Sequence, residues 1–274
     1  MKIKATAVPD SIRMISAERL REFREFTGSD AHGVTLHQHS TCVSGGFMPL
    51  VALTEIALRN CVNEAMARHL GVQDWLLMQP LPAVLKPEEV HRVNKGIRDA
   101  QRAMYAKLTN QEKVALDTLA FPNGVPANIT HDQRVKRRQQ KITVTQGKVI
   151  AQLTIYFWKR LFSADYDSSL WRPALKKVFP DKRIKRADVA ECLERIYVLR
   201  NRIAHHEVIL TRHLAGVTEA FMFVGLNLRP VNATDHDALA DLLLHHMLAA
   251  GKHVTTMGKF IDRTTRPKWF NWFG

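Results

Sequence analysis

The sequence predicts an all-α protein, and three observations support that class. Glycine and proline are sparse, at 13 and 11 of 274 residues, which disfavours a β-sandwich with many turns. Apolar residues recur three or four positions apart in several long segments, as they do on the buried face of a helix. No convincing run of strands is present. With 46% apolar residues the chain can build a sizeable core, and 1–274 is predicted to form a single domain.

The first part of the chain is predicted to contain two helices separated by a loop. A first helix is expected over 11–27, where IRMISAERLREFREF has helical apolar spacing. The segment 29–46 is polar and contains glycines, so it is predicted to be a loop. The strongest helical pattern covers 47–71, and Gly71 is the expected stop.

The remaining helices are predicted from the same spacing and from acidic or proline-containing starts. They cover 86–108, 145–162, 187–210 and 234–254. The segment 119–141 is rich in Pro, Asn and Gly and ends in a basic run, which indicates a loop or arm. A short helical piece and a basic connector are expected over 170–186. The expected result is a helical bundle with its core at about 47–210, to which 211–274 adds C-terminal helices and an aromatic tail.

The charge balance indicates a polyanionic partner. Lys and Arg total 40 against 26 Asp and Glu, for a formal charge of +14. Two basic runs are candidate RNA-binding residues: Arg134, Lys136, Arg137, Arg138 and Lys141 in the first, and Lys182, Arg183, Lys185 and Arg186 in the second. Such side chains would contact phosphates without reading sequence, although a charge run is also the usual composition of a solvated helix face. The aromatic tail, Trp269, Phe270, Trp272 and Phe273, would stack on bases, dock on a partner or fold back on its own core.

Cysteine usage and targeting signals predict a cytoplasmic protein with no membrane attachment. The three cysteines form no CxxC pair, as expected in a reducing compartment. The N-terminus lacks the apolar region of a signal peptide, and stretches such as ALADLLLHHMLAAG are too short to span a bilayer. The HQH run at 37–39 has no third ligand cluster beside it, and no glycine-rich nucleotide loop occurs, so neither a metal nor another cofactor is expected.

The stretch LRNRIAHHEVIL, residues 199–210, carries the residue types that metal-independent RNA cleavage needs. In that reaction the 2′-hydroxyl attacks the neighbouring phosphorus, histidine transfers protons and a cation stabilises the phosphorane. Arg200 and His205 supply these groups, but five residues on a straight helix turn about 140° out of phase. Either the helix ends between them, or each serves a site shared with a second copy. The simpler alternative is a basic helix end that complements its own macrodipole.

Three ordered blocks of this sequence resemble the HEPN superfamily of ribonucleases, and in particular its Abi-like branch associated with abortive infection. Arg200, Asn201 and His205 match the superfamily signature of Arg, a polar residue, three more residues and His. LTEIALRNCVNEAMARHLG (53–71) resembles the first motif helix, and 147–180 resembles the middle block with its aromatic run, Leu-Trp and Phe-Pro. The likeness ends at about residue 210.

The resemblance implies an α-helical HEPN core, commonly dimeric, with metal-independent endoribonuclease activity. It assigns the catalytic pair to Arg200 and His205, and it places Asn201 at the polar position that follows the arginine. His206 and Glu207 match the Abi-like extension, and Glu207 stands where some relatives carry a tyrosine, whose role therefore does not transfer. Glu55, Arg59 and Asn60 match the first motif helix and are expected near the signature, with Glu55 orienting Arg200 or Arg59.

The functional hypothesis is a metal-independent endoribonuclease of a prokaryotic abortive-infection, phage-defence or toxin system. The alternative is a binding module that holds a structured RNA without cutting it, in which the motif serves as a phosphate clamp or dimer seam. A third possibility, a basic protein of the membrane surface, is supported by charge alone. RNA and a second copy of the chain are the expected partners.

Overall fold

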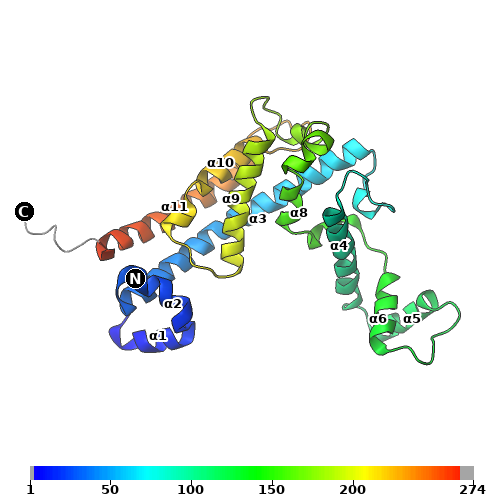
Figure 1. The fold of residues 1–274 in the computed structure, drawn as a ribbon, viewed down its shortest axis with the longest axis horizontal. Coiled ribbons are helices and arrows are strands. Elements are labelled where there is room, and N and C mark those ends of the chain that lie inside the picture. The colour runs from blue at the N-terminus through cyan, green and yellow to red at the C-terminus, as the bar shows by residue number, and fades with distance from the viewer. Residues whose placement is uncertain (1–2, 266–274) are drawn as a thin grey trace, which may run out of the picture. The chain divides into compact units, whose positions relative to one another are not determined.

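The structure is a computed structural model that describes residues 3–265, and it confirms the all-α class because no strand occurs among these residues (Figure 1). The chain divides into two compact units. Unit 1 comprises residues 1–58 and 179–274, and unit 2 comprises residues 59–178. The aromatic tail singled out from the sequence lies outside the described residues.

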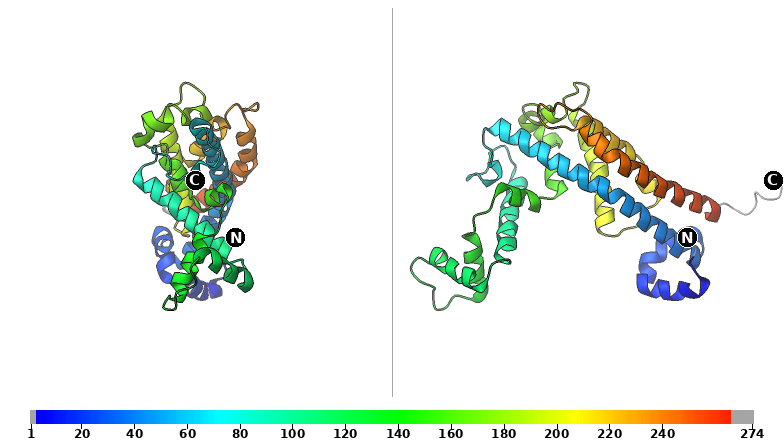
Figure 2. Two further views of the ribbon diagram at one scale, coloured as in Figure 1. Left: turned by 90° about the vertical axis from the view of Figure 1, so that its right-hand side faces the viewer. Right: turned by 180° about the vertical axis from the view of Figure 1, so that it is seen from behind.

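Unit 1 is a bundle of helices from both ends of the chain. Its elements are α1 (Val8–Ile15), α2 (Ala17–Thr27), α3 (Asp30–Leu70) as far as Leu58, α9 (Arg186–Ala204), a 3-10 turn (Thr211–Leu214), α10 (Val217–Asn227) and α11 (Ala238–Thr265). α10 packs against both α9 and α11. α11 runs beside α3 (Figure 2), and a Cβ added at Gly46 would lie 3.1 Å from the Ala250 Cα, so the two backbones meet closely there.

The prediction of a loop over 29–46 is wrong, because α3 begins at Asp30 and continues unbroken to Leu70. Three buried residues of this segment, followed by Phe47, lie at spacings of four, three and four: Leu36, Ser40, Val43 and Phe47. They extend the apolar stripe of the predicted 47–71 helix towards the N-terminus. Packing of this face overrides the weak helix propensity of Gly45, Gly46 and Pro49.

The single helix predicted over 11–27 is two helices. Ser16 has a φ of 86°, which ends α1 and turns the chain into α2. The Ser16 side chain then accepts a hydrogen bond from the Arg19 backbone N–H at 3.2 Å and so caps the second helix. The turn directs α2 back beside α1, and α2 carries Arg19 and Phe23 towards the candidate site described below.

Unit 2 contains the rest of α3 and a succession of shorter helices. They are a 3-10 turn (Trp75–Leu77), α4 (Pro87–Tyr105), α5 (Asn110–Ala120), α6 (His131–Gln140), α7 (Gln146–Gln152), α8 (Ile155–Arg160) and three short turns at Ala164–Tyr166, Asp167–Trp171 and Leu175–Val178. The helix predicted over 145–162 is broken at Leu153 and Thr154 into α7 and α8. The loop predicted over 119–141 is wrong for its second half, where Thr130 and Gln133 form a capping box that starts α6.

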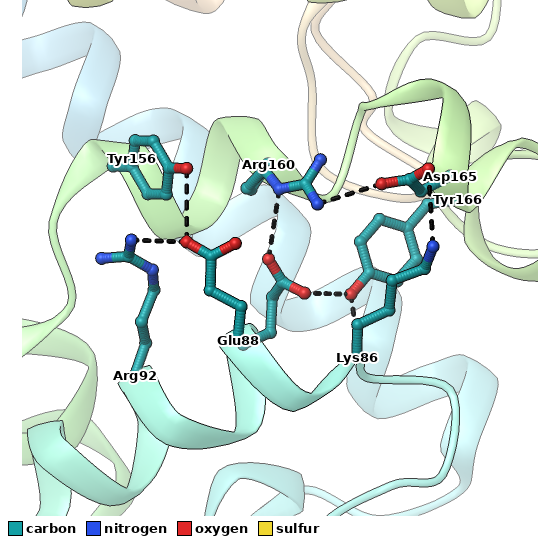
Figure 3. A network of polar contacts seen from close by, with 8 residues as sticks. Lys86, Glu88, Arg92, Tyr156, Arg160, Asp165 and Tyr166 are labelled. Atoms are coloured by element: carbon teal, nitrogen blue, oxygen red, sulfur yellow. Dashed lines mark hydrogen bonds and ion pairs between the residues drawn. The ribbon is translucent and has the colours of Figure 1, made fainter.

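A buried carboxylate near the start of α4 contacts the Arg160 guanidinium at the end of α8 and the Tyr166 hydroxyl that follows it (Figure 3). Glu89 is fully buried and accepts a hydrogen bond from the Tyr166 hydroxyl at 2.5 Å. The Arg160 guanidinium lies 3.4 Å from the other Glu89 oxygen and also donates to Asp165 at 3.0 Å. Burial and the hydrogen bond to Glu89 raise the pKa of Tyr166, so its proton stays in place. Glu88, one residue earlier, is exposed and pairs with Arg92 at 2.7 Å.

Among residues 3–265, α3 is the one helix long and apolar enough to cross a membrane by length and composition. Its most apolar window has a mean hydropathy of 1.5, and 33% of that window is buried. A single helix of this kind near the N-terminus is weak evidence for a span, because the core helix of a soluble protein passes the same test. Within unit 1, α3 contributes buried residues that include Leu36, Val43 and Leu50.

Candidate functional site

The helix that carries the motif ends between Arg200 and His205. α9 runs to Ala204, and His205 is the residue that caps it, with φ −94° and ψ 6°. The Glu207 backbone N–H donates to the Arg202 carbonyl at 2.8 Å, and the His206 N–H donates to the Ile203 carbonyl at 3.1 Å. These two bonds form a Schellman motif, which satisfies carbonyls that the helix end leaves open. The sequence left two explanations for the spacing of Arg200 and His205: a helix that ends between them, or a site shared with a second copy. The structure shows that the helix ends between them.

His206 occupies the left-handed position of this motif, with a φ of 53°. Glycine is the usual residue there, because an L side chain strains the backbone in that region. Its main-chain carbonyl accepts a hydrogen bond from the Arg19 guanidinium at 2.7 Å, and its side chain is exposed. The backbone of His206 is therefore fixed by the turn and by α2, while its imidazole makes no hydrogen bond or ion pair with the described residues.

Glycine at position 206 should leave the protein as stable as the wild type or stabilise it by up to about 1 kcal/mol. Relief of the strain at positive φ offsets the larger chain entropy that glycine has when unfolded. Urea unfolding followed by circular dichroism at neutral pH would measure the change. His206→Ala, which retains the Cβ, should unfold close to the wild type, and a loss well above 1 kcal/mol for the glycine variant would mean that the imidazole holds the turn.

A buried hydroxyl holds the segment after the turn against α3. Ser40 is 3% exposed, and its Oγ accepts a hydrogen bond from the Ile209 backbone N–H at 3.1 Å. Arg202 donates to the Val208 carbonyl at 3.2 Å and lies 3.5 Å from a Glu207 carboxylate oxygen. Residues 205–209 are thus positioned by α2, α3 and α9 together.

Two adjoining pockets open at this turn. One, of about 450 Å³, is polar and includes Arg19, Arg202 and His205 in its lining. The other, of about 320 Å³, extends between α2 and α3 and includes Phe23 and His37. Both are lined by Arg19, and both are also lined by His206 and Glu207.

The structure does not bring all the predicted catalytic residues into these pockets. His205, His206 and Glu207 line the larger one, but neither pocket is lined by Arg200 or Asn201. The Arg200 guanidinium is half-buried and lies 3.4 Å from the Asn201 amide oxygen. The arginines that line this pocket with His205 within one protomer are Arg19, Arg21 and Arg202.

Most charges around the larger pocket are paired, and Arg19 is the exception among its arginines. Arg21 lies 3.1 Å from Glu18, and Arg202 pairs with Glu207. The described contact of the Arg19 side chain is with a neutral carbonyl rather than a carboxylate. The Arg19 guanidinium therefore has no carboxylate partner among the described residues. Its positive charge can bind a phosphate in this pocket.

Three of the four predicted supporting residues lie on α3, and the fourth, Glu207, lies in the turn after α9. Glu55 is half-buried and belongs to unit 1, but it has no hydrogen bond or ion pair with Arg200 among the described residues. Arg59 and Asn60 follow on the same helix and belong to unit 2. No described ion pair joins Glu55 to Arg59, so the expected orienting contact is absent from the residues described.

The first basic run divides into paired and exposed side chains on α6. Arg138 is buried and donates to Asp117 at 2.7 and 2.5 Å, and Arg134 donates to the same carboxylate. These two hydrogen-bonded guanidinium groups hold the pKa of Asp117 well below its usual range. Both arginines join α6 to α5, which makes them structural. Lys136, Arg137 and Lys141 are exposed and remain candidates for phosphate contact.

The second basic run precedes and starts α9. Lys182 is exposed, Arg183 is exposed but pairs with Asp181 at 2.7 Å, and Arg186 is half-buried as the first residue of the helix. Lys185 is exposed, and its backbone N–H donates to Asp188 at 2.9 Å. Lys182 and Lys185 are therefore the side chains of this run that reach solvent without a described carboxylate.

Sequence reasoning missed Arg19 and His37 as site residues. His37 lies in the segment predicted to be a loop, where it was considered only as a metal ligand together with His39. On α3 the two histidine side chains contact different residues. The His37 ring meets Phe23 edge-on at 5.3 Å, whereas His39 lies 5.0 Å from Phe260. No group of three metal-ligating side chains lies together among residues 3–265. A helical reading of 29–46 would have placed His37 and Ser40 one turn apart on one face.

No family model matches this sequence, and neither the curated proteins nor the solved structures include a significant match to it.

Proposed function

We propose that the protein is a metal-independent endoribonuclease that cleaves RNA at the turn after α9. The observation that carries the proposal is the position of His205, an exposed imidazole at the end of α9 whose pocket also contains Arg19 and Arg202. Histidine transfers protons near neutral pH, and guanidinium groups hold phosphate oxygens. The high positive charge of the chain supports a nucleic acid as the substrate.

In the proposed reaction His205 transfers the proton between the 2′-hydroxyl and the leaving 5′-oxygen. Arg19 and Arg202 steady the phosphate before and during attack, and Asn201 holds the Arg200 side chain at the end of α9. Because Arg200 lies outside the pocket of its own protomer, we assign it to the pocket of a second copy in a homodimer. This division accords with the five-residue offset between Arg200 and His205 and with the dimers implied by the HEPN resemblance.

The activity is tested by incubating purified protein with a mixed RNA in EDTA and, separately, in magnesium. Cleavage should proceed at the same rate in both, and the products should end in a 2′,3′-cyclic phosphate, because the nucleophile is the RNA's own hydroxyl. Cleavage that requires magnesium, or products with a 5′-phosphate, would contradict the mechanism. The same sequence resemblance leads us to propose an abortive-infection, phage-defence or toxin role in the cytoplasm.

One observation favours a second function, that of an RNA-binding protein that does not cleave. Neither Arg200 nor Asn201 lines the pocket that contains His205, so the three signature residues do not meet in one pocket of a single protomer. Exposed Lys136, Arg137 and Lys141 on α6 would then hold a structured RNA through its phosphates. Binding that weakens steeply with salt, while the RNA is recovered at full length, would favour this function over the nuclease.

A further inference from the structure

The smaller pocket has walls of two kinds. Its lining includes the apolar side chains of Ile15 and Phe23. It also includes three hydroxyl residues of α3, and His206 and Glu207 of the turn after α9. Its volume of about 320 Å³ lies at the lower end of the range for small-molecule sites. A flat, apolar-faced molecule with polar edges matches such walls, and a nucleobase is a molecule of that form.

Three polar groups of this pocket, on Thr41, Ser44 and Glu207, present hydrogen-bond acceptors. The Thr41 hydroxyl donates its proton to the His37 carbonyl at 3.0 Å, and the Ser44 hydroxyl donates to the Ser40 carbonyl at 3.0 Å. Each oxygen is therefore left with lone pairs for the pocket. The Glu207 carboxylate, which also lines it, accepts only. A ligand edge that donates hydrogen bonds suits this set of oxygens.

His37 also lines the pocket and adds one donor and one acceptor. Burial lowers the pKa of His37, and the nearby Arg19 charge lowers it further, so the ring is neutral at neutral pH. A neutral imidazole has one N–H and one bare nitrogen. Its ring is packed on Phe23 and makes no hydrogen bond with the residues described, which leaves both nitrogens for a ligand.

We propose that this pocket binds one unstacked base of single-stranded RNA, preferring a base with an exocyclic amino group, while the phosphate of that nucleotide lies beside Arg19 in the adjoining pocket. The two pockets share Arg19, His206 and Glu207, so a base in one and its phosphate in the other would lie next to each other. Adenine and cytosine present an amino donor where uracil presents a carbonyl acceptor. The inference rests on the proposed function for its choice of RNA, but it requires no cleavage.

The test measures binding to RNA that cannot be cut. Homopolymers of roughly eight 2′-O-methyl nucleotides of adenine, cytosine and uracil lack the attacking hydroxyl, and fluorescence anisotropy gives their dissociation constants over a range of salt concentrations. The wild type should bind the adenine and cytosine polymers about five- to tenfold more tightly than the uracil polymer. His37→Ala and Ser44→Ala should remove that difference and leave the salt dependence unchanged, because they alter contacts to a base.

Arg19→Ala should instead weaken all three polymers alike and reduce the salt slope by about one, as expected for a phosphate contact, and Arg19→Lys should restore part of the loss. The matched control is His39→Ala, a histidine of the same helix that faces Phe260 and should keep the wild-type preference. Equal or absent binding of the three polymers by the wild type, or an unchanged preference in a folded His37→Ala variant, would overturn the proposal. If the protein prefers adenine and cytosine polymers but never cleaves RNA, the base-binding pocket is supported and the proposed nuclease activity is rejected.

Discussion

Alanine in place of His205 should reduce the rate of RNA cleavage by about 10²- to 10⁴-fold, the usual contribution of one positioned proton-transfer group. The substitution should leave the fold intact. His205 is exposed at the end of α9, and its described hydrogen bonds come from its backbone N–H, which alanine retains. Single-turnover cleavage of a labelled RNA would measure the rate. His131→Ala is the control, because His131 is exposed on α6 in unit 2 and should retain full activity.

Mixing two inactive variants separates a shared site from a site within one protomer. Arg200→Ala and His205→Ala should each be inactive as homodimers, but a heterodimer of the two would contain one pocket with both side chains intact. Activity should therefore return on mixing, to roughly a quarter of the wild-type value, for random exchange of subunits. No recovery from subunits that demonstrably exchange would reject the assignment of Arg200 to the second copy. Full activity of Arg200→Ala alone would leave Arg19 and Arg202 as the phosphate-binding cations.

Glu89→Ala should destabilise unit 2 by about 3–5 kcal/mol, the loss expected when one partner of a buried ion pair is removed. Without the carboxylate, the Tyr166 hydroxyl and the Arg160 guanidinium lose their shared partner at a fully buried position. Urea unfolding followed by tryptophan fluorescence measures this change, because Trp75, Trp158 and Trp171 all belong to unit 2.

Two variants show whether the loss arises from the buried contact. Glu89→Gln retains the shape and an acceptor for the Tyr166 proton, so its unfolding midpoint should fall between those of the wild type and the alanine variant. Glu88→Ala removes the neighbouring carboxylate of the same helix turn, which is exposed, and should unfold close to the wild type. If the Glu88 and Glu89 variants unfold alike, burial at position 89 has no special importance for stability.

The sequence predicted best those helices whose apolar residues form an uninterrupted stripe. The segment 47–71 is helical as expected, and its Leu50, Leu58 and Ala65 are buried. The preceding segment failed as a prediction because one member of its buried stripe is Ser40, a polar residue whose partner, the Ile209 amide, lies far along the chain. Polar residues and glycines then indicated a loop where packing against α11 maintains the helix.

The candidate site was predicted only as far as a single segment could indicate it. Composition and spacing identified His205 and the possibility that the helix ends before it, because both depend on neighbours in sequence. Arg19 lines the pocket of His205, and His37 lines the adjoining one, through contacts between α2, α3 and the turn. Contacts between segments that are far apart in the sequence produce no repeating pattern of residues that could predict them. Likewise, the pairing of Arg134 and Arg138 with Asp117 depends on how α5 meets α6, so the charge run alone overstated the number of exposed cations.

The hydrogen bond from the Ile209 amide to the Ser40 hydroxyl supplies a natural probe of motion at the site. Both residues are buried, so this amide can exchange its proton for deuterium only when the turn after α9 separates from α3. The exchange rate of that one amide, read by NMR, thus gives the free energy of local opening at the pocket. Slower exchange in the presence of RNA would measure how much a bound strand stabilises the closed turn, independently of any catalytic step.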